Sequence, residues 1–399
     1  MAKRVVLAYS GGLDTSVAVR WMIDNYGVEV IALAANVGQG GGDDDDTLKS
    51  RALAAGAVEA IVIDCRREFA NDFLAPAIKA NALYESRYPL VSSLSRPIIV
   101  RHLVAAARSL GADAVAHGCT GKGNDQVRFE VNTRALAPDL EVLAPVREWG
   151  MTREDSIDYA KRHDIPVRVT KASPYSIDSN LWGRAIECGI LEDPWESPPE
   201  DVYDLTVQTE TEPDEVEVGF SDGVPVTLDG IALPLHELIT AIGGLAGSYG
   251  FGRIDMVESR RVGIKSREVY EAPAALALLL AHADLEGLTL ERDVAHEKVR
   301  LEPRWAELVY DGMWYSPLKQ ALDAFVDETQ RHVRGDVRLR FEPGRCTVVG
   351  RRSETGLYDY GLATYDAADQ FRHQDAAGFV RLWGLGVETW ARRQRGGHR

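Results

Sequence analysis

Long apolar runs and closely spaced metal ligands are both absent from this sequence of 399 residues. A membrane-spanning helix needs about 20 apolar residues, whereas the longest candidate, residues 272–283, is shorter and contains Pro273. The nine histidines form no HxH or HxxxH pair, so we expect no metal site built on imidazole. No basic segment followed by a short apolar stretch precedes the first predicted strand, and we therefore expect neither a secretory leader nor a membrane partner.

Cysteine is scarce as well. The four cysteines lie far apart and form no CxxC pair: Cys65, Cys119, Cys188 and Cys346. This usage argues against a disulfide framework and against a structural zinc site. It predicts a reduced protein of the cytoplasm.

Positive charge is outnumbered by negative charge. Lys and Arg together number 45 and Asp and Glu number 61, which gives a net charge of −16. Such a balance repels the nucleic-acid backbone, so we expect no nucleic-acid partner. It is compatible with a nucleotide, which needs only a local cluster of donors. An apolar content of 45% is typical of a globular protein, and the length suits two domains.

The first part of the chain alternates predicted strands and helices. Strands are expected at residues 5–8, 28–37, 60–64, 114–117 and 142–144. Helices are expected between them, at residues 16–25, 47–55, 67–81 and 96–110. This order indicates an α/β domain whose parallel sheet is covered on both faces. Ligands bind beyond the carboxyl ends of such strands, so the loops after Ala8, Val37 and His117 are expected to form one site.

Beyond residue 165 the alternation stops. We expect a short strand at 165–169, an irregular segment at 173–183, a hairpin of 216–220 with 225–228, helices at 235–246, 273–282, 290–310 and 318–333, and a strand pair at 337–341 and 347–349. This mixture indicates a separate α+β domain. The closely packed charges of residues 252–271 are expected to form a solvated strand face.

Three regions follow from these patterns: residues 1–165, 166–365 and 366–399. In the last one, apolar residues are sparse and mostly aromatic, for example Trp383 and Trp390. Such an arm buries little of its own surface, so it is expected to pack on another subunit. The alternative is a helix docked on its own domain.

Residues 8–16 form a Gly-containing turn between the first strand and a helix. The free N–H groups of the first helical turn and the helix dipole favour an anion there. Gly11 and Gly12 let the backbone approach a ligand, and neighbouring hydroxyl groups add donors. The alternative is a tight turn that needs glycine for geometry alone. Asp14 beside a polyanion indicates an intervening cation, most simply Mg²⁺.

The loop after the second strand, residues 38–46, is rich in glycine and aspartate. Residues 43–46 would form either a metal cluster or a solvated loop whose last aspartate caps a helix from Thr47. We favour the cap, because four carboxylates beside a triphosphate would repel it. The small residues Ala34 and Ala35 leave room for an adenine ring.

Residues 81–97 are predicted as a loop between two helices. Pro97 would lie near the start of the second helix, where the first turn tolerates proline. Tyr88 and Ser93 are polar residues of this loop that could meet a ligand, although either one alone would be assigned to the surface.

Residues 117–130 form a second segment dense in polar groups and glycine. It suits a zwitterionic small molecule, with Arg128 for a carboxylate, Asp125 for an ammonium group, and Thr120 and Asn124 to orient the ligand. The alternative is a polar surface loop with a Gly-Lys-Gly turn. We favour the ligand site, since this segment also follows a strand at the predicted rim.

Together these segments resemble argininosuccinate synthase. The sequence Ser-Gly-Gly-x-Asp-x-Ser at residues 10–16 is similar to the pyrophosphate loop of the N-type ATP pyrophosphatases and lacks the ending of a Walker A loop. Residues 120–128, 173–180 and 258–270 follow in the order and spacing of argininosuccinate synthase. The resemblance implies an adenine nucleotide alpha hydrolase-like domain followed by a synthetase domain and a C-terminal oligomerisation arm.

The resemblance also implies a reaction, that of an AMP-forming ligase of arginine biosynthesis. Citrulline, aspartate and ATP would give argininosuccinate, AMP and pyrophosphate, with Mg²⁺. The ureido oxygen of citrulline would attack the α-phosphorus to form a citrullyl-adenylate, and the aspartate amine would then displace AMP. The implied assembly is a homotetramer whose C-terminal arm reaches into neighbouring subunits.

Carried over residue by residue, the resemblance implies three sets of contacts. ATP would contact Ala8, Tyr9, Ser10, Gly11, Gly12, Leu13, Asp14, Thr15, Ser16, Ala35 and Gly118. Aspartate would contact Thr120, Asn124 and Asp125. Citrulline would contact Tyr88, Ser93, Asn124, Arg128, Ser176, Glu258 and Tyr270. Catalysis would depend on Asp14, which lies near Mg²⁺, and on Asn124 and Asp125.

Two positions depart from the family's pattern. Some members have a serine where this chain has Ala185, so that contact with citrulline is absent here. The loop of residues 40–46 is longer and more acidic than the family's Gln-x-Glu-Asp form, so a contact of this loop with ATP is not carried over. Glu258 and Tyr270 rest on the resemblance alone.

Other functions explain fewer of these features. A tRNA-modifying adenylating enzyme would need a basic RNA surface, and this chain is acidic. An amidotransferase relative would need an ammonia source, and we expect no glutaminase domain upstream of the first strand. A nucleotide-binding regulator would have no use for the second polar segment, residues 120–128.

Overall fold

The computed structural model describes residues 3–40, 44–166 and 174–395. The chain divides into two compact units, Met1–Thr355 and Gly356–Arg399. The strand predicted at residues 165–169 falls mostly outside the described residues. Within these residues, no helix has both the length and the apolar character needed to cross a membrane.

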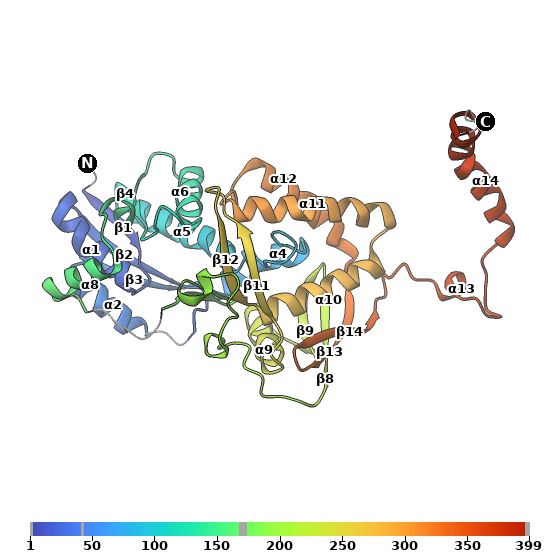
Figure 1. The fold of residues 1–399 in the computed structure, drawn as a ribbon, viewed down its shortest axis with the longest axis horizontal. Coiled ribbons are helices and arrows are strands. Elements are labelled where there is room, and N and C mark those ends of the chain that lie inside the picture. Colours follow the sequence, from blue (N-terminus) through green and yellow to red (C-terminus); the bar gives the residue numbers. More distant parts are fainter. Residues whose placement is uncertain (1–2, 41–43, 167–173, 396–399) are drawn as a thin grey trace. The chain divides into compact units, whose positions relative to one another are not determined.

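A parallel sheet forms the start of the first unit (Figure 1). Its strands run in the order β3-β2-β1-β4-β5, and their bounds are β1 Arg4–Ala8, β2 Glu29–Asn36, β3 Glu59–Asp64, β4 Ala114–Ala116 and β5 Glu141–Leu143. Side chains alternate along β1, so that Val5 and Leu7 pack with α1 and α8 while Val6 lies in the core of the opposite face. The α/β prediction is therefore confirmed.

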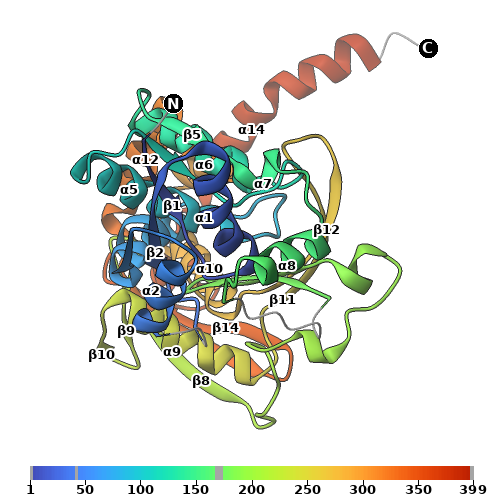
Figure 2. The same cartoon turned by 90° about the vertical axis from the view of Figure 1, so that its left-hand side faces the viewer.

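Helices cover both faces of this sheet (Figure 2). They are α1 Leu13–Tyr26, α2 Asp45–Ala54, α3 Arg66–Phe69, α4 Ala75–Lys79, α5 Val91–Ser109, α6 Asp125–Leu136, α7 Pro145–Glu148 and α8 Arg153–Arg162. A π-helical turn, η1 Ala70–Leu74, joins α3 to α4. The cap predicted at Asp46 lies two residues earlier, at Asp44, whose side chain accepts the Thr47 N–H at 2.7 Å, so that α2 begins at Asp45.

The predicted loop of residues 81–97 is wrong in its second half. Helix α5 begins at Val91, so Ser93 is helical and Pro97 lies inside the helix rather than at its start. Proline there removes one backbone hydrogen bond. Val91 and Leu94 are fully buried, and this burial outweighs the weak helix preference of the serines and proline around them.

The rest of the first unit is α+β, as predicted. One sheet has the order β11-β12-β7-β6 and the other β10-β9-β8-β13-β14. The strand bounds are β6 Ser176–Asn180, β7 Gly183–Glu187, β8 Asp214–Ser221, β9 Val224–Leu228, β10 Ile231–Ala232, β11 Arg253–Ser259, β12 Lys265–Glu271, β13 Gly335–Glu342 and β14 Arg345–Arg352. The principal helices are α9 Leu235–Ser248, α10 Pro273–Thr289, α11 Arg292–Tyr310 and α12 Pro317–Thr329.

Strand β6 corrects another prediction, since residues 173–183 were expected to be irregular. The strand forms because it pairs antiparallel with β7, from Ser176 opposite Glu187 to Asn180 opposite Gly183. Serine, aspartate and asparagine have little strand propensity of their own, so pairing with a neighbour decides the structure.

The second unit contains α13 Tyr360–Ala363, α14 His373–Trp390 and the π-helical turn η5 Ala391–Arg395. None of the residues of α14 is buried. Its large apolar side chains are among the most exposed of the described residues, with Trp383 80% and Val387 69% exposed.

Candidate active site

A cavity of about 300 Å³ lies beyond the carboxyl ends of β1 and β4, where the parallel sheet meets the β11-β12-β7-β6 sheet. It is lined by Asp14, Tyr88, Ser92, Arg96, Gly118, Cys119, Thr120, Gly123, Asn124, Asp125, Arg128, Ser176, Asp178, Ala185, Glu187, Glu258, Arg260, Glu268 and Tyr270. The position matches the rule that ligands of open α/β sheets bind beyond the carboxyl ends of the strands.

The turn from β1 into α1 has the features of an anion site. Gly12 is the N-cap and makes no side-chain cap, so the first N–H groups of α1 are left for a ligand. The Ser10 and Thr15 hydroxyl oxygens lie 3.1 Å apart. Gly11 has φ +74°, and a Cβ there would lie 2.6 Å from Leu48 Cδ2, so this position requires glycine.

Asp14 projects from the first turn of α1 into the cavity. Burial raises the pKa of the Asp14 carboxyl group, and the positive charge of Arg153 opposes this shift only in part. Among the described residues, Asp14 takes part in no ion pair or side-chain hydrogen bond that would compensate its charge. A carboxylate without a partner beside an anion site fits a hard divalent cation, for which carboxylate oxygen is a preferred ligand.

Gly118 brings the end of β4 against this turn. A Cβ at Gly118 would lie 2.9 Å from Thr15 Cγ2, so only glycine allows the two segments to approach this closely. Ala35 lies near the end of β2, the neighbour of β1, and is 8% exposed. Of the predicted ATP contacts, Asp14 and Gly118 line the cavity, whereas Ala35 and the other residues of the loop are not among its lining residues.

Asp125, the first residue of α6, lies between two arginines. Arg96 Nη2 is 2.7 Å from Asp125 Oδ2, and Arg128 Nη1 is 2.8 Å from Asp125 Oδ1. Burial raises the pKa of Asp125, but the two guanidinium groups outweigh it and hold the pKa at about 2. Arg96 also binds Asp178, at 2.8 Å. Asp125 is therefore charged at neutral pH, and it already has two cationic partners before any ligand binds.

Glu258 is a buried carboxylate held by two tyrosines. Tyr270 donates to Glu258 Oε2 at 2.8 Å and Tyr310 donates to Oε1 at 2.7 Å. Glu258 is 4% exposed and lines the cavity. Tyr88 stacks on Tyr270 with ring centroids 4.2 Å apart. This arrangement presents a negative group and aromatic walls to a ligand.

Two further carboxylates of the cavity lining, Glu187 and Glu268, share one arginine. Arg260 Nη2 is 2.6 Å from both Glu187 Oε2 and Glu268 Oε1. Burial, together with the charges of Glu187 and Glu258, raises the pKa of Glu268 despite the arginine. One guanidinium thus serves two carboxylates here, as Arg96 does for Asp125 and Asp178.

One face of the four-stranded sheet provides much of the cavity wall. The lining residues alternate along each strand, with Ser176 and Asp178 on β6, Ala185 and Glu187 on β7, and Glu268 and Tyr270 on β12. This is the two-residue period of a strand. Residues 252–271 were expected to form a solvated strand face. Three charged residues of this segment, Glu258, Arg260 and Glu268, line the cavity instead, so the prediction is wrong for them.

The structure brings most of the predicted substrate contacts together. Those that line the cavity are Tyr88, Thr120, Asn124, Asp125, Arg128, Ser176, Glu258 and Tyr270. Ser93, which is 1% exposed, is not among the lining residues.

Sequence reasoning missed six charged or polar lining residues: Ser92, Arg96, Asp178, Glu187, Arg260 and Glu268. A signal existed for the first two, since Ser92 and Arg96 are four residues apart and share one face of α5. It was hidden because α5 was expected to begin after Ser92.

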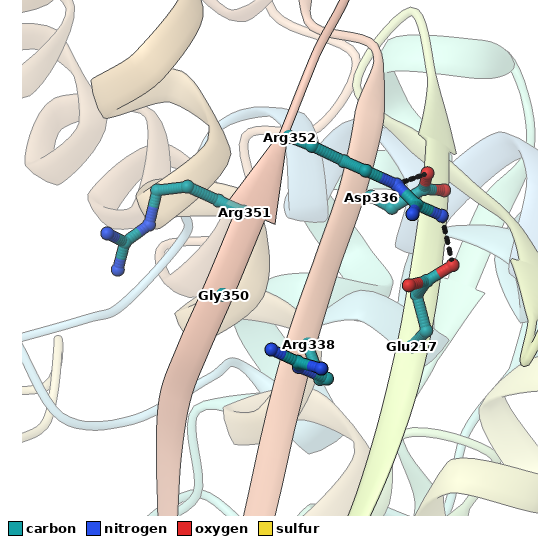
Figure 3. Close-up of a pocket in the computed structure, with 6 residues that line it drawn as sticks. All are labelled: Glu217, Asp336, Arg338, Gly350, Arg351 and Arg352. Carbon is teal, nitrogen blue, oxygen red and sulfur yellow. Dashed lines mark hydrogen bonds and ion pairs between the residues drawn. The ribbon is translucent and has the colours of Figure 1, made fainter.

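A second hollow, of about 190 Å³, lies on the β8-β13-β14 sheet (Figure 3). It is lined by Glu217, Asp336, Arg338, Gly350, Arg351 and Arg352. Arg352 binds both Asp336 and Glu217, and the other two arginines also pair with carboxylates. Its charges are compensated within the sheet, so this hollow offers less to a ligand than the first cavity.

Comparison with known proteins gives matches to two family models and to solved structures. Residues 4–166 match the family model described as the arginosuccinate synthase N-terminal HUP domain. Residues 175–390 match the model of the arginosuccinate synthase C-terminal domain. A solved structure of NAD+ synthetase from Burkholderia pseudomallei is 18% identical, with a TM-score of 0.27; the match covers 42% of this chain and 63% of that chain.

The two family models cover both the parallel-sheet part and the α+β part of the chain, and the second alone spans more than half of it. These matches support the ligation of citrulline and aspartate, and they imply the use of ATP. The chain belongs to the argininosuccinate synthase family.

Proposed function

We propose that this chain joins citrulline and aspartate to argininosuccinate in the cavity described above, with cleavage of ATP to AMP and pyrophosphate. One observation carries the proposal: a single cavity collects Asp14 of the phosphate loop, the polar segment from Gly118 to Arg128, and the charged face of the four-stranded sheet. A reaction with three substrates needs these groups within reach of one another.

ATP would bind with its phosphates at the start of α1. The N–H groups of this turn and the hydroxyl groups of residues 10–16 would hold the departing pyrophosphate. Mg²⁺ would be held by Asp14 and would neutralise charge on the phosphates. The close approach of Gly118 to Thr15 supports a position of the polar segment beside the same phosphates.

Citrulline would lie along the sheet face. Arg128 would bind its carboxylate with Nη2, since Nη1 donates to Asp125 and Nε donates to a backbone carbonyl group, while Glu258 would bind its ammonium group. Tyr88, Ser176 and Tyr270 would enclose the rest. The ureido oxygen would then attack the α-phosphorus, and pyrophosphate would leave.

Aspartate would bind at the start of α6, through Thr120, Asn124 and Asp125. Its amine would displace AMP from the ureido carbon. With a pKa held at about 2, Asp125 orients the amine as an anion rather than accepting its proton. Among the proposed contacts, Ser93, Ala35 and the residues of the phosphate loop other than Asp14 do not line the cavity.

The reaction can be tested by incubating the protein with ATP and Mg²⁺, with and without each amino acid. We expect pyrophosphate and AMP only when citrulline is present, and argininosuccinate only when aspartate is added as well. Chelation of the metal should stop pyrophosphate release, and added Mg²⁺ should restore it. Production of ADP, or pyrophosphate release that ignores citrulline, would contradict the proposal.

A variant pair tests the role of Asp14. We expect Asp14→Asn to slow citrulline-dependent pyrophosphate release by about tenfold or more, because the charge that faces the cation is lost. Asp24→Asn, on the same helix but paired with Arg20 at the surface, should change the rate by less than about twofold. Equal effects of the two variants on the rate of pyrophosphate release would contradict a metal-binding role for Asp14.

The assembly, the compartment and the domain limits also belong to the proposal. The exposed apolar side chains of α14 support a homotetramer joined through the C-terminal arm. The described cysteines are all unpaired, which supports a reducing compartment such as the cytoplasm. The domain limits stay at residues 1–165, 166–365 and 366–399.

A further inference from the structure

Tyr310, the last residue of α11, lies behind the cavity wall and contacts three of the proposed substrate residues. It is 1% exposed and is not among the residues lining the cavity. Its hydroxyl group accepts a hydrogen bond from Asn124 Nδ2 at 2.7 Å and donates one to Glu258 Oε1 at 2.7 Å. Its carbonyl oxygen accepts a hydrogen bond from Arg128 Nε at 3.0 Å.

The hydroxyl group determines which way the Asn124 amide points. Asn124 has two N–H donors and one carbonyl oxygen. The backbone N–H of Arg261 donates to that oxygen at 3.0 Å, and Tyr310 takes one N–H. A single N–H and one acceptor position are left for the cavity, and rotation of the amide by a half turn would break both bonds.

The same hydroxyl group holds Glu258. Tyr310 and Tyr270 each donate to a different carboxylate oxygen, so the plane of the carboxylate is set from two sides. No ion pair to Glu258 is present among the described residues, and its remaining lone pairs are available to a cationic ligand. Burial and the nearby Glu258 raise the pKa of Tyr310, so the hydroxyl stays protonated and continues to donate.

The ring of Tyr310 cannot easily turn. Tyr84 stacks on it with centroids 3.6 Å apart and planes at 4°, and Tyr88 meets it edge-on. The guanidinium carbon of Arg128 lies 4.9 Å from the ring centroid, within range of a cation–π interaction. The hydroxyl group therefore has a fixed direction, and Arg128 is held by both the ring and the carbonyl group.

We propose that Tyr310 is a positioning residue that aligns Asn124, Glu258 and Arg128 for the two amino-acid substrates without touching either substrate. This inference rests on the proposed function. It predicts a division of effects: loss of the hydroxyl group should impair the use of citrulline and aspartate, whereas ATP, bound at the start of α1, should be little affected.

The test is Tyr310→Phe, which removes the hydroxyl and keeps the ring, the stacking and the carbonyl bond to Arg128. We expect kcat/KM for citrulline in pyrophosphate release to fall by about ten- to a hundredfold, because a buried carboxylate and a buried amide each lose a partner. The KM for ATP should change by less than about twofold. Equal losses for all three substrates would overturn the inference.

Tyr249→Phe is the matched control. Tyr249 is 3% exposed, and its hydroxyl donates to a backbone carbonyl, that of Glu212, at 2.8 Å, away from the cavity. Its loss should leave the kinetic constants unchanged. If wild-type protein shows no citrulline-dependent pyrophosphate release, the proposed function is wrong; if wild type is active and Tyr310→Phe behaves as Tyr249→Phe does, only the inference is wrong.

A double-mutant cycle provides a second measurement. If Tyr310 acts through Glu258, then Tyr310→Phe added to Glu258→Gln should cost much less in citrulline use than it costs in the wild type. Full additivity would mean that Tyr310 has no part in positioning Glu258 and would overturn that part of the inference.

Discussion

The cavity wall contains two carboxylates, Asp125 and Asp178, that share the guanidinium group of Arg96. Arg128 adds a second cation to Asp125. Burial alone would raise the pKa of Asp125, yet the two arginines hold it at about 2. A carboxylate with such a pKa is a poor proton acceptor at neutral pH. In the proposed reaction Asp125 would contribute a fixed negative charge, and another group would accept the proton of the aspartate amine.

The pKa of Asp125 has a consequence for stability. Because the folded pKa lies below the usual 3.8, the charged carboxylate stabilises the fold above pH 4, and this contribution is lost as the pH falls through 3.8 towards about 2. We expect Asp125→Asn to lower the free energy of unfolding at pH 6, with a difference from wild type that narrows as the pH is lowered. Denaturant titrations from pH 6 downwards measure this.

The control is Asp158→Asn on α8, whose side chain is 71% exposed. It should change the free energy of unfolding by less than about 0.5 kcal/mol. A gap between wild type and Asp125→Asn that stays constant with pH would contradict the proposed ionic role of Arg96 and Arg128.

At the scale of elements, the parallel sheet could be predicted closely. The predicted strands contain long apolar runs, such as residues 30–35, and such runs are easily recognised. The polar segment 117–130 could also be found, because its residues are neighbours in the chain. Its second half is helical rather than a loop, since Asp125 begins α6.

The sheet half of the site could not be found in this way. Glu258 lies on β11 and Tyr270 on β12, and Tyr270 donates to Glu258. Their connection to Asn124 runs through the hydroxyl group of Tyr310, which is 186 residues from Asn124 along the sequence. Pairing between β6 and β7 creates a strand from residues with little strand propensity. The resemblance identified Glu258 and Tyr270; only the three-dimensional structure identifies Arg96 and Tyr310.

One buried carboxylate at the end of β12 connects this strand to β7 and to the segment around residue 205. Glu271 is fully buried; it accepts hydrogen bonds from the N–H groups of Asp204 and Thr206 and from the Thr206 hydroxyl group, and it pairs with Arg184. We expect Glu271→Gln to lower the free energy of unfolding by about 3 kcal/mol, because it leaves Arg184 without its counter-charge and turns an N–H group toward donors. Urea denaturation measures the change.

Glu200→Gln serves as the comparison for this prediction. Glu200 pairs with Arg253, but its side chain is 80% exposed, so its loss should cost less than about 1 kcal/mol. Similar losses of unfolding free energy in the two variants would contradict the prediction that the buried contacts of Glu271 stabilise the fold more than an exposed ion pair does.

At the scale of the molecule, the first compact unit has a core that does not stop at residue 165. Its largest cluster of buried side chains includes Leu33 of the parallel sheet, Trp182 of the β6–β7 turn and Trp305 of α11. The cavity likewise takes groups from both parts. Asp14 and Tyr270 line the same cavity because the two parts are packed into one compact unit.

The second compact unit leads to a prediction about assembly. In α14, Phe379, Trp383, Val387 and Trp390 recur at spacings of four, four and three residues, which places them along one stripe of the helix. Each is at least 45% exposed. Burial of such an apolar stripe against a partner lowers the free energy relative to its exposure to water. We therefore propose that this stripe is part of the interface of the proposed tetramer.

We expect Trp383→Glu to reduce the molar mass measured by light scattering after size-exclusion chromatography, because it places a charge in the centre of this stripe. Arg381→Glu, which alters charge on the same helix at a residue outside the stripe, should keep the wild-type mass. Each variant should retain the unfolding temperature of the first compact unit, whose core does not include α14. A wild-type protein that is monomeric at micromolar concentration, or a Trp383→Glu variant with unchanged mass, would contradict an interface built on this helix.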